Sequence, residues 1–160
     1  MIRLESPDQP EVTELIGELD AYQSSLYPKE SNHLLDLAAL LRPTVLFAVA
    51  RDPAGHALAC GAIVVTPAFA EIKRMFVRPV ARGQGLGRAL LGFLEAEAAR
   101  HGCQRLMLET GVRQPEALRL YEGAGYTRRS RFGVYPDDRL SVFMEKPLTA
   151  LDFSADTSSV

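Results

Sequence analysis

The sequence has little of what marks several specialised classes of protein. It contains two cysteines and no tryptophan, and none of its apolar runs approaches the roughly 20 residues that cross a bilayer. Cys60 and Cys103 match neither a disulfide framework nor the ligand spacing of a zinc site. The segment 1–11 carries charges and lacks the apolar stretch of a signal peptide. These absences predict a cytoplasmic protein that uses no metal and no membrane.

Neither sign of charge is in large excess. Eighteen basic residues stand against 20 acidic ones, which gives a formal net charge of -2. A chain with this balance is not expected to hold nucleic acid by bulk electrostatics. With 160 residues, 47% of them apolar, one core is expected. The hydrophobic pattern fades after Pro147, which predicts a single domain over 1–147 and a flexible tail over 148–160.

Hydrophobic periodicity alternates between that of strands and that of helices along the domain. Strands are predicted at 2–5, 44–51, 57–66, 71–77, 104–109, 126–131 and 140–146. Helices are predicted at 10–22, from a cap at Ser31 or Asn32 to Leu41, at 86–100 and at 115–123. This order is that of an α/β (α+β) protein whose sheet is mostly antiparallel at its start.

A glycine-rich loop, Arg82-Gly83-Gln84-Gly85-Leu86-Gly87-Arg88, connects a strand to an amphipathic helix. Glycines let the backbone approach a ligand closely, and a helix start offers unpaired N–H groups, so the loop favours a pyrophosphate. Its spacing excludes the dinucleotide-binding fingerprint and the P-loop. A glycine-rich turn without a ligand is the alternative.

Two motifs in this order resemble those of the GNAT superfamily of acyl-coenzyme A-dependent N-acyltransferases. Arg82, Gly85 and Gly87 match its Arg/Gln-x-x-Gly-x-Gly/Ala signature. The family also has an Asn-x-x-Ala-x-x-x-Tyr helix, and Gln114, Ala117 and Tyr121 stand at that spacing. Gln114 departs from the usual Asn by one methylene. The resemblance extends over 1–147.

The resemblance implies a fold and a co-substrate, acetyl-CoA. The fold is a central mixed, mostly antiparallel sheet of six to seven strands with about four helices. In it a bulged strand splays from a parallel neighbour and holds the pantetheine arm. The residues that the resemblance assigns to coenzyme binding are Phe76, Val77, Arg82, Gly83, Gln84, Gly85, Leu86, Gly87, Arg88, Gln114 and Ala117.

The implied reaction is direct attack of a primary amine, from a small molecule or a peptide, on the thioester in a ternary complex. It needs a base for the amine, donors for the oxyanion and an acid for the thiolate, and backbone N–H groups at the bulge can serve as oxyanion donors. Tyr121 matches the family position whose hydroxyl reaches the coenzyme sulfur, and its ordinary pKa of about 10 keeps it protonated. A core tyrosine is the alternative interpretation.

The base and the acceptor site are less specified. Glu71 stands where the histone-acetylating branch of the family has a catalytic glutamate, although a strand-opening Glu is often only solvated. His33 is a second candidate base. Two loops are candidates for the acceptor site, with Glu30 and His33 in one and Tyr135 and Asp137 in the other. A coenzyme-binding sensor with little catalysis is the alternative function, and a homodimer along the last strands is an open expectation.

Overall fold

The computed structural model describes residues 1–31 and 36–148. The elements of these ranges are β1 (Ile2–Leu4), α1 (Pro10–Leu26), α2 (Leu37–Leu40), β2 (Val45–Arg51), β3 (Ala57–Val65), β4 (Ala70–Val77), α3 (Leu86–Arg100), β5 (Arg105–Gly111), α4 (Pro115–Gly123), β6 (Thr127–Arg129) and β7 (Ser141–Pro147). Two 3₁₀ turns, η1 (Lys29–Ser31) and η2 (Pro79–Ala81), follow α1 and β4. The predicted tail lies, from residue 149 on, outside the described residues.

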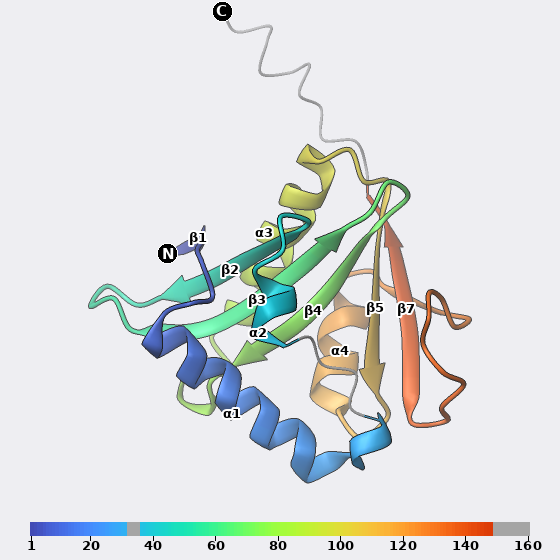
Figure 1. The fold of residues 1–160 in the computed structure, drawn as a ribbon, viewed down its shortest axis with the longest axis horizontal. Helices are drawn as coiled ribbons and strands as arrows, with labels where there is room; N and C mark the ends of the chain where they lie inside the picture. The colour runs from blue at the N-terminus through green and yellow to red at the C-terminus, as the bar shows by residue number, and fades with distance from the viewer. Residues whose placement is uncertain (32–35, 149–160) are drawn as a thin grey trace, which may run out of the picture.

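In the described part of the chain the strands form one seven-stranded sheet in the order β1-β2-β3-β4-β5-β7-β6 (Figure 1). All neighbours pair antiparallel except β4 and β5, which are parallel. The crossover between these two strands is α3, as a parallel connection requires. The predicted mixed, mostly antiparallel sheet with four helices is therefore confirmed.

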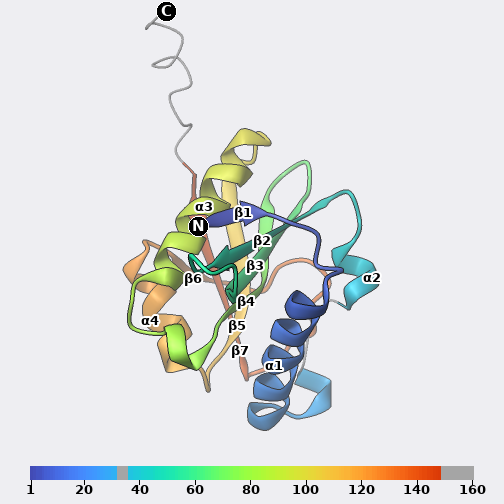
Figure 2. The same ribbon diagram turned by 90° about the vertical axis from the view of Figure 1, so that its left-hand side faces the viewer.

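Helices cover both faces of the sheet, with α1 and α2 on one side and α3 and α4 on the other (Figure 2). Side chains alternate between the faces of a strand, so each face builds its own core. On β2, Phe47 and Val49 pack with the helix α1 residues Val12 and Leu15. Ala48, on the same strand, instead joins the core under α3 and α4. Strands buried on both faces explain the continuous apolar runs in the sequence.

A third, aromatic cluster covers the end of the sheet that α1 does not reach. Phe132 and Tyr135 come from the loop between β6 and β7 and pack with Phe143 of β7, each pair of rings edge to face with centroids 5.5 Å apart. Met107 of β5 lies under them. The loop is thereby held on the same face of the sheet as α1.

Most element boundaries lie within one or two residues of the predicted ones, and α4 has the predicted bounds. Helix α1 runs four residues longer than predicted, to Leu26. The prediction for the second helix was wrong, because α2 has a single turn whose cap is Asp36, with its carboxylate accepting the Ala39 N–H at 2.8 Å. Ser31 belongs to η1 instead. Asn32 lies outside the described residues.

Among the helices of the described ranges, none has both the length and the hydropathy that a membrane span requires.

Candidate active site

The site begins at a bulge in β4. Register with β3 shifts so that two residues of β4, Arg74 and Met75, stand opposite Gly61. Arg74 has φ +60°, a left-handed conformation that is rare without glycine. The Met75 side chain packs directly over Gly61, where a Cβ would meet its sulfur. The resemblance implied this bulge, and the structure confirms it.

The extra residue changes which way the side chains after it point. Lys73 and Arg74 both turn toward the face that α1 covers, and the Arg74 guanidinium binds Asp20 of α1 at 2.6 Å. Met75 packs on the opposite face, with the core under α3. The bulge therefore brings two cations to the α1 face at the point where the sheet opens.

The opening lies between the two parallel strands. Pairing of β4 with β5 ends at Ile72 and Leu108, so residues 73–77 have no ladder partner on β5. Tyr27, from the end of α1, fills part of the opening, and its ring lies so close to Gly111 that any Cβ there would overlap it. The Tyr27 hydroxyl accepts the Arg113 N–H at 3.1 Å and donates to Gln114 Oε1 at 3.2 Å. The longer amide of Gln114 thus has a partner within the protein.

On one side of the opening lies a groove of about 490 Å³. Ten of the eleven residues assigned to coenzyme binding line this groove, and Tyr121 lines it too. Gln84, which is exposed, is the exception. Gly83 and Gly85 adopt φ values of +77° and +76°, which only glycine takes without strain, and Gly85 directly precedes α3. Here the first N–H groups of α3 have no partner within the helix.

The arginines of the loop bind the protein itself. Arg82 Nε donates to the Val77 carbonyl at 3.0 Å, and its guanidinium lies over the rings of Tyr22 and Phe76. Arg88 donates to the Gly123 carbonyl at 2.9 Å and so ties α3 to α4. These two hydrogen bonds help to hold the walls of the groove in place. Both side chains are therefore engaged within the protein, and the loop presents backbone N–H groups at the start of α3.

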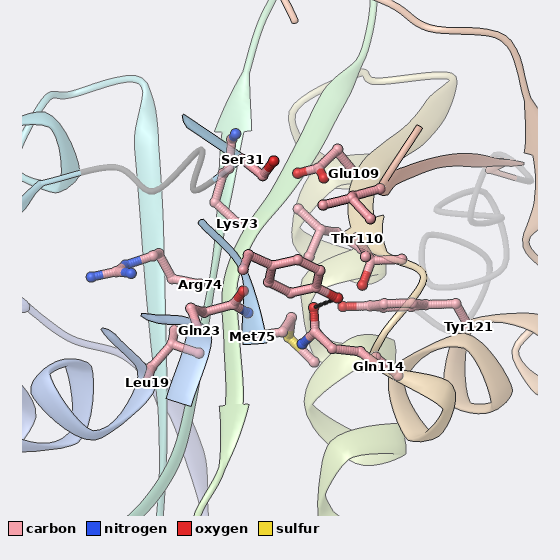
Figure 3. A pocket seen from close by; sticks show the side chains of 15 residues that line it. Leu19, Gln23, Ser31, Lys73, Arg74, Met75, Glu109, Thr110, Gln114 and Tyr121 are labelled. Atoms are coloured by element: carbon pink, nitrogen blue, oxygen red, sulfur yellow. Dashed lines mark hydrogen bonds between the residues drawn. The ribbon is translucent and has the colours of Figure 1, made fainter. Parts of the chain in front are cut away.

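On the other side of the opening lies a smaller cavity of about 90 Å³. Its residues come from the second half of α1, the middle of β4, the end of β5, α4, η1 and the loop before β7 (Figure 3). In the figure Lys73, Ser31 and Glu109 gather toward one end, and Gln114 and Tyr121 lie toward the other. The cavity and the groove share the lining residues Leu19, Met75, Gln114, Ala117 and Tyr121. The two hollows therefore meet at Tyr121.

Tyr121 is held rigidly at this junction. Its side chain is buried and packs edge to face on Tyr126, with ring centroids 5.7 Å apart. Burial, and then the nearby charge of Glu109, raise the pKa of its hydroxyl above the ordinary value. A phenol in this environment stays protonated and serves as a donor rather than a base.

Two carboxylates lie near the cavity, in different surroundings. Glu71 binds the Lys73 ammonium at 3.1 Å and accepts a hydrogen bond from the Tyr135 hydroxyl. Glu109 lines the cavity itself, and burial raises its pKa to about 7, against the lowering effects of a hydrogen bond to Ser141 and the charge of Lys73. Glu71 is thus already paired with a cation, whereas the pKa of Glu109 lies near neutral pH.

The structure separates the predicted acceptor residues. Tyr135 reaches the site through its hydrogen bond to Glu71. Glu30 and Asp137 are exposed and line neither hollow. Asp138, next in sequence, is the residue whose carboxylate accepts the Ser31 hydroxyl at 2.5 Å. His33 lies outside the described residues.

Sequence reasoning missed Glu109 and Lys73 as site residues. The signal for Glu109 was its place as a lone acidic residue in the apolar strand β5. Lys73 gives no such signal, because β4 also carries Glu71 and Arg74. Nothing in the local pattern around Tyr27 indicates that its ring packs against Gly111, 84 positions further along the chain.

Comparison with known proteins shows to which family the chain is related. The model of the acetyltransferase (GNAT) family matches residues 11–126. The chain is 50% identical over 149 residues to a protein named IAA acetyltransferase from Azospirillum brasilense, which covers 92% of this chain and 97% of that protein. It is 32% identical over 151 residues to the uncharacterized N-acetyltransferase YsnE of Bacillus subtilis, covering 92% and 99% of the two chains.

Solved structures agree. A candidate acyl-CoA N-acyltransferase from Klebsiella pneumoniae superposes with a TM-score of 0.83 at 43% identity, covering 93% of this chain and 97% of that one. An aminoglycoside 6'-N-acetyltransferase complexed with coenzyme A shares the fold, with a TM-score of 0.72 at 16% identity over 93% and 97% of the two chains.

The chain belongs to the acetyltransferase (GNAT) family. It is an enzyme of that family, an N-acetyltransferase that depends on acetyl-CoA.

Proposed function

We propose that this enzyme transfers the acetyl group of acetyl-CoA to a nitrogen of a small molecule, by direct attack in a ternary complex. The observation that carries the proposal is the meeting of two hollows at Tyr121, one long and glycine-lined, the other small and polar. Acetyl-CoA would lie in the groove along Phe76 and Val77, with its pyrophosphate at the start of α3. The acceptor would occupy the cavity.

The residues at the junction support a division of labour. Tyr121, protonated because it is buried, donates a proton to the departing thiolate. Backbone N–H groups at the bulge around Arg74 and Met75 stabilise the oxyanion of the tetrahedral intermediate. The sequence predicted Glu71 as the base, and the cavity adds Glu109 as a second carboxylate for that role.

The cavity favours a small acceptor over a peptide. It holds about 90 Å³ and is bounded by η1 and by the loop before β7, which Ser31 and Asp138 join by a hydrogen bond. The name of the Azospirillum relative suggests an acceptor class, indole-3-acetic acid and related small molecules. Primary amines of small metabolites remain in the same proposal.

A screen of acceptors tests this function. Purified enzyme with acetyl-CoA is offered indole-3-acetic acid, small primary amines and short peptides, while coenzyme A release is followed and products are identified by mass spectrometry. We expect an N-acetylated small molecule to form together with free coenzyme A. Coenzyme binding, seen as a higher melting temperature, without an acetylated product across the screen would contradict the proposal and favour a sensor.

A further inference from the structure

The two carboxylates of the site differ in whether they can reach a ligand. Glu71 lies in the paired part of the β4–β5 ladder, opposite Met107, and its carboxylate is held by Lys73 and Tyr135. Glu109 is the first residue of β5 beyond the last paired position, where the strands part. Glu109 lines the cavity and Glu71 does not.

The groups that act on Glu109 come from several separate elements around the cavity. From β4, the Lys73 ammonium attracts its charge and Glu71 repels it, and from the loop before β7 Asp138 repels it. The Ser141 hydroxyl at the start of β7 is its hydrogen-bond partner. From α4 and α1, Glu109 faces the phenols of Tyr121 and Tyr27, whose pKa values its charge helps to raise.

We propose that Glu109 is the general base that takes the proton from the acceptor nitrogen, and that Glu71 acts indirectly, as a positioning residue that holds Lys73 beside the cavity. This inference rests on the proposed N-acetyl transfer. A carboxyl that titrates near neutrality is well matched to proton abstraction in that pH range, and burial puts Glu109 there. The ion pair of Glu71 leaves its carboxylate engaged.

The step balances without a further reactant. The acceptor nitrogen forms a bond to the thioester carbon, and its proton passes to the Glu109 carboxylate. The C–S bond breaks, and the thiolate takes the proton of the Tyr121 hydroxyl. Glu109 then releases its proton to solvent and Tyr121 regains one, so an amine and a thioester become an amide and a thiol.

The test compares Glu109→Gln with the matched Glu71→Gln, using the best acceptor from the screen and following kcat/KM from about pH 5.5 to 9. Wild-type activity should rise through about pH 7, where Glu109 loses its proton. Glu109→Gln should lose that rise and about 100-fold or more in kcat/KM. Glu71→Gln should keep the rise, because Glu109 is still present to titrate, and should lose less of kcat/KM than Glu109→Gln.

Two further variants test the same group without altering it. Lys73→Met removes an attracting charge and Ser141→Ala removes a hydrogen bond, so both should move the rise to higher pH. All variants share the acceptor, so differences between them report the protein group rather than the acceptor nitrogen. Neither carboxylate lines the groove, and the acetyl-CoA-induced rise in melting temperature should persist in both Gln variants.

Several results would overturn the inference. If the rise of kcat/KM near pH 7 survives in Glu109→Gln, or is abolished only in Glu71→Gln, a group other than Glu109 is the base. Should Glu109→Gln fail to bind acetyl-CoA, an unmoved rise in Lys73→Met and Ser141→Ala would overturn it as well. Absence of N-acetyl product with the wild type would instead refute the proposed function itself, and this inference with it.

Discussion

The two hollows of the active site are built by different means. Ten of the residues that line the groove come from one continuous segment, the end of β4, the glycine loop and the start of α3, and three of the ten are glycines, which have no side chain. The cavity is made of side chains such as Lys73, Glu109 and Tyr27, which come from separate elements. A backbone site tolerates many side chains but few changes of conformation. A side-chain site tolerates neither loss of its groups nor movement of the elements that carry them.

The largest effect should come where the hollows meet. Tyr121→Phe removes the proton donor for the thiolate while keeping the ring that packs on Tyr126. We expect kcat to fall by about 100-fold or more, with little change in the affinity for acetyl-CoA. Single-turnover kinetics and coenzyme titration would check this. A loss of coenzyme affinity with kcat unchanged would assign Tyr121 to binding only.

The buried carboxyl of Glu109 in the cavity should also change how the stability of the protein depends on pH. Glu109 keeps its proton in the folded state up to about pH 7 and loses it near 4.5 when unfolded, so its contribution is present below 4.5 and lost above 7. Glu109→Gln has no such proton. It should be more stable than the wild type at high pH, by up to about 3 kcal/mol, and by little at low pH. Urea unfolding at both extremes tests this, and a difference independent of pH would contradict it.

The backbone site is probed at its left-handed glycine. Gly85→Ala puts a Cβ at φ +76°, which costs about 1–2 kcal/mol in a conformation that L residues avoid. Relaxation of the loop should raise the KM for acetyl-CoA about 10-fold and leave the pH profile unchanged. Gly92, inside α3 with open space around its Cα, offers the control substitution to Ala. An equal rise in the KM for acetyl-CoA in Gly85→Ala and Gly92→Ala would contradict this prediction.

The smallest effect is expected at the edge of the cavity. Tyr27→Phe keeps the ring against Gly111 but removes the hydroxyl that joins Gln114 to the Arg113 N–H. The loss should be about 1 kcal/mol of stability, with a higher KM for the acceptor and an unchanged KM for acetyl-CoA. Chemical unfolding and steady-state kinetics measure both. A rise in the KM for acetyl-CoA alone would show that Gln114 serves the groove instead.

The difference between the groove and the cavity also explains why the sequence predicted one better than the other. The order of the elements follows from local patterns. The bulge and ten lining residues of the groove follow from the family resemblance, which rests on two short motifs whose residues are close in the chain. The cavity depends on the turn of Lys73 at the bulge, on Tyr27 entering the gap beside Gly111, and on the loop that brings Tyr135 to Glu71. The last two of these contacts join residues 84 and 64 positions apart, and no local pattern encodes them.

The hydrogen bond between Ser31 and Asp138 has a consequence for engineering. It joins the two segments that close the cavity, η1 and the loop before β7, and neither segment contributes to the groove. Exchanging both segments as a matched pair, with the joining bond retained, would alter which acceptor enters while the coenzyme half of the enzyme is inherited intact. The bond thus marks a unit that can be transplanted to retarget the catalyst.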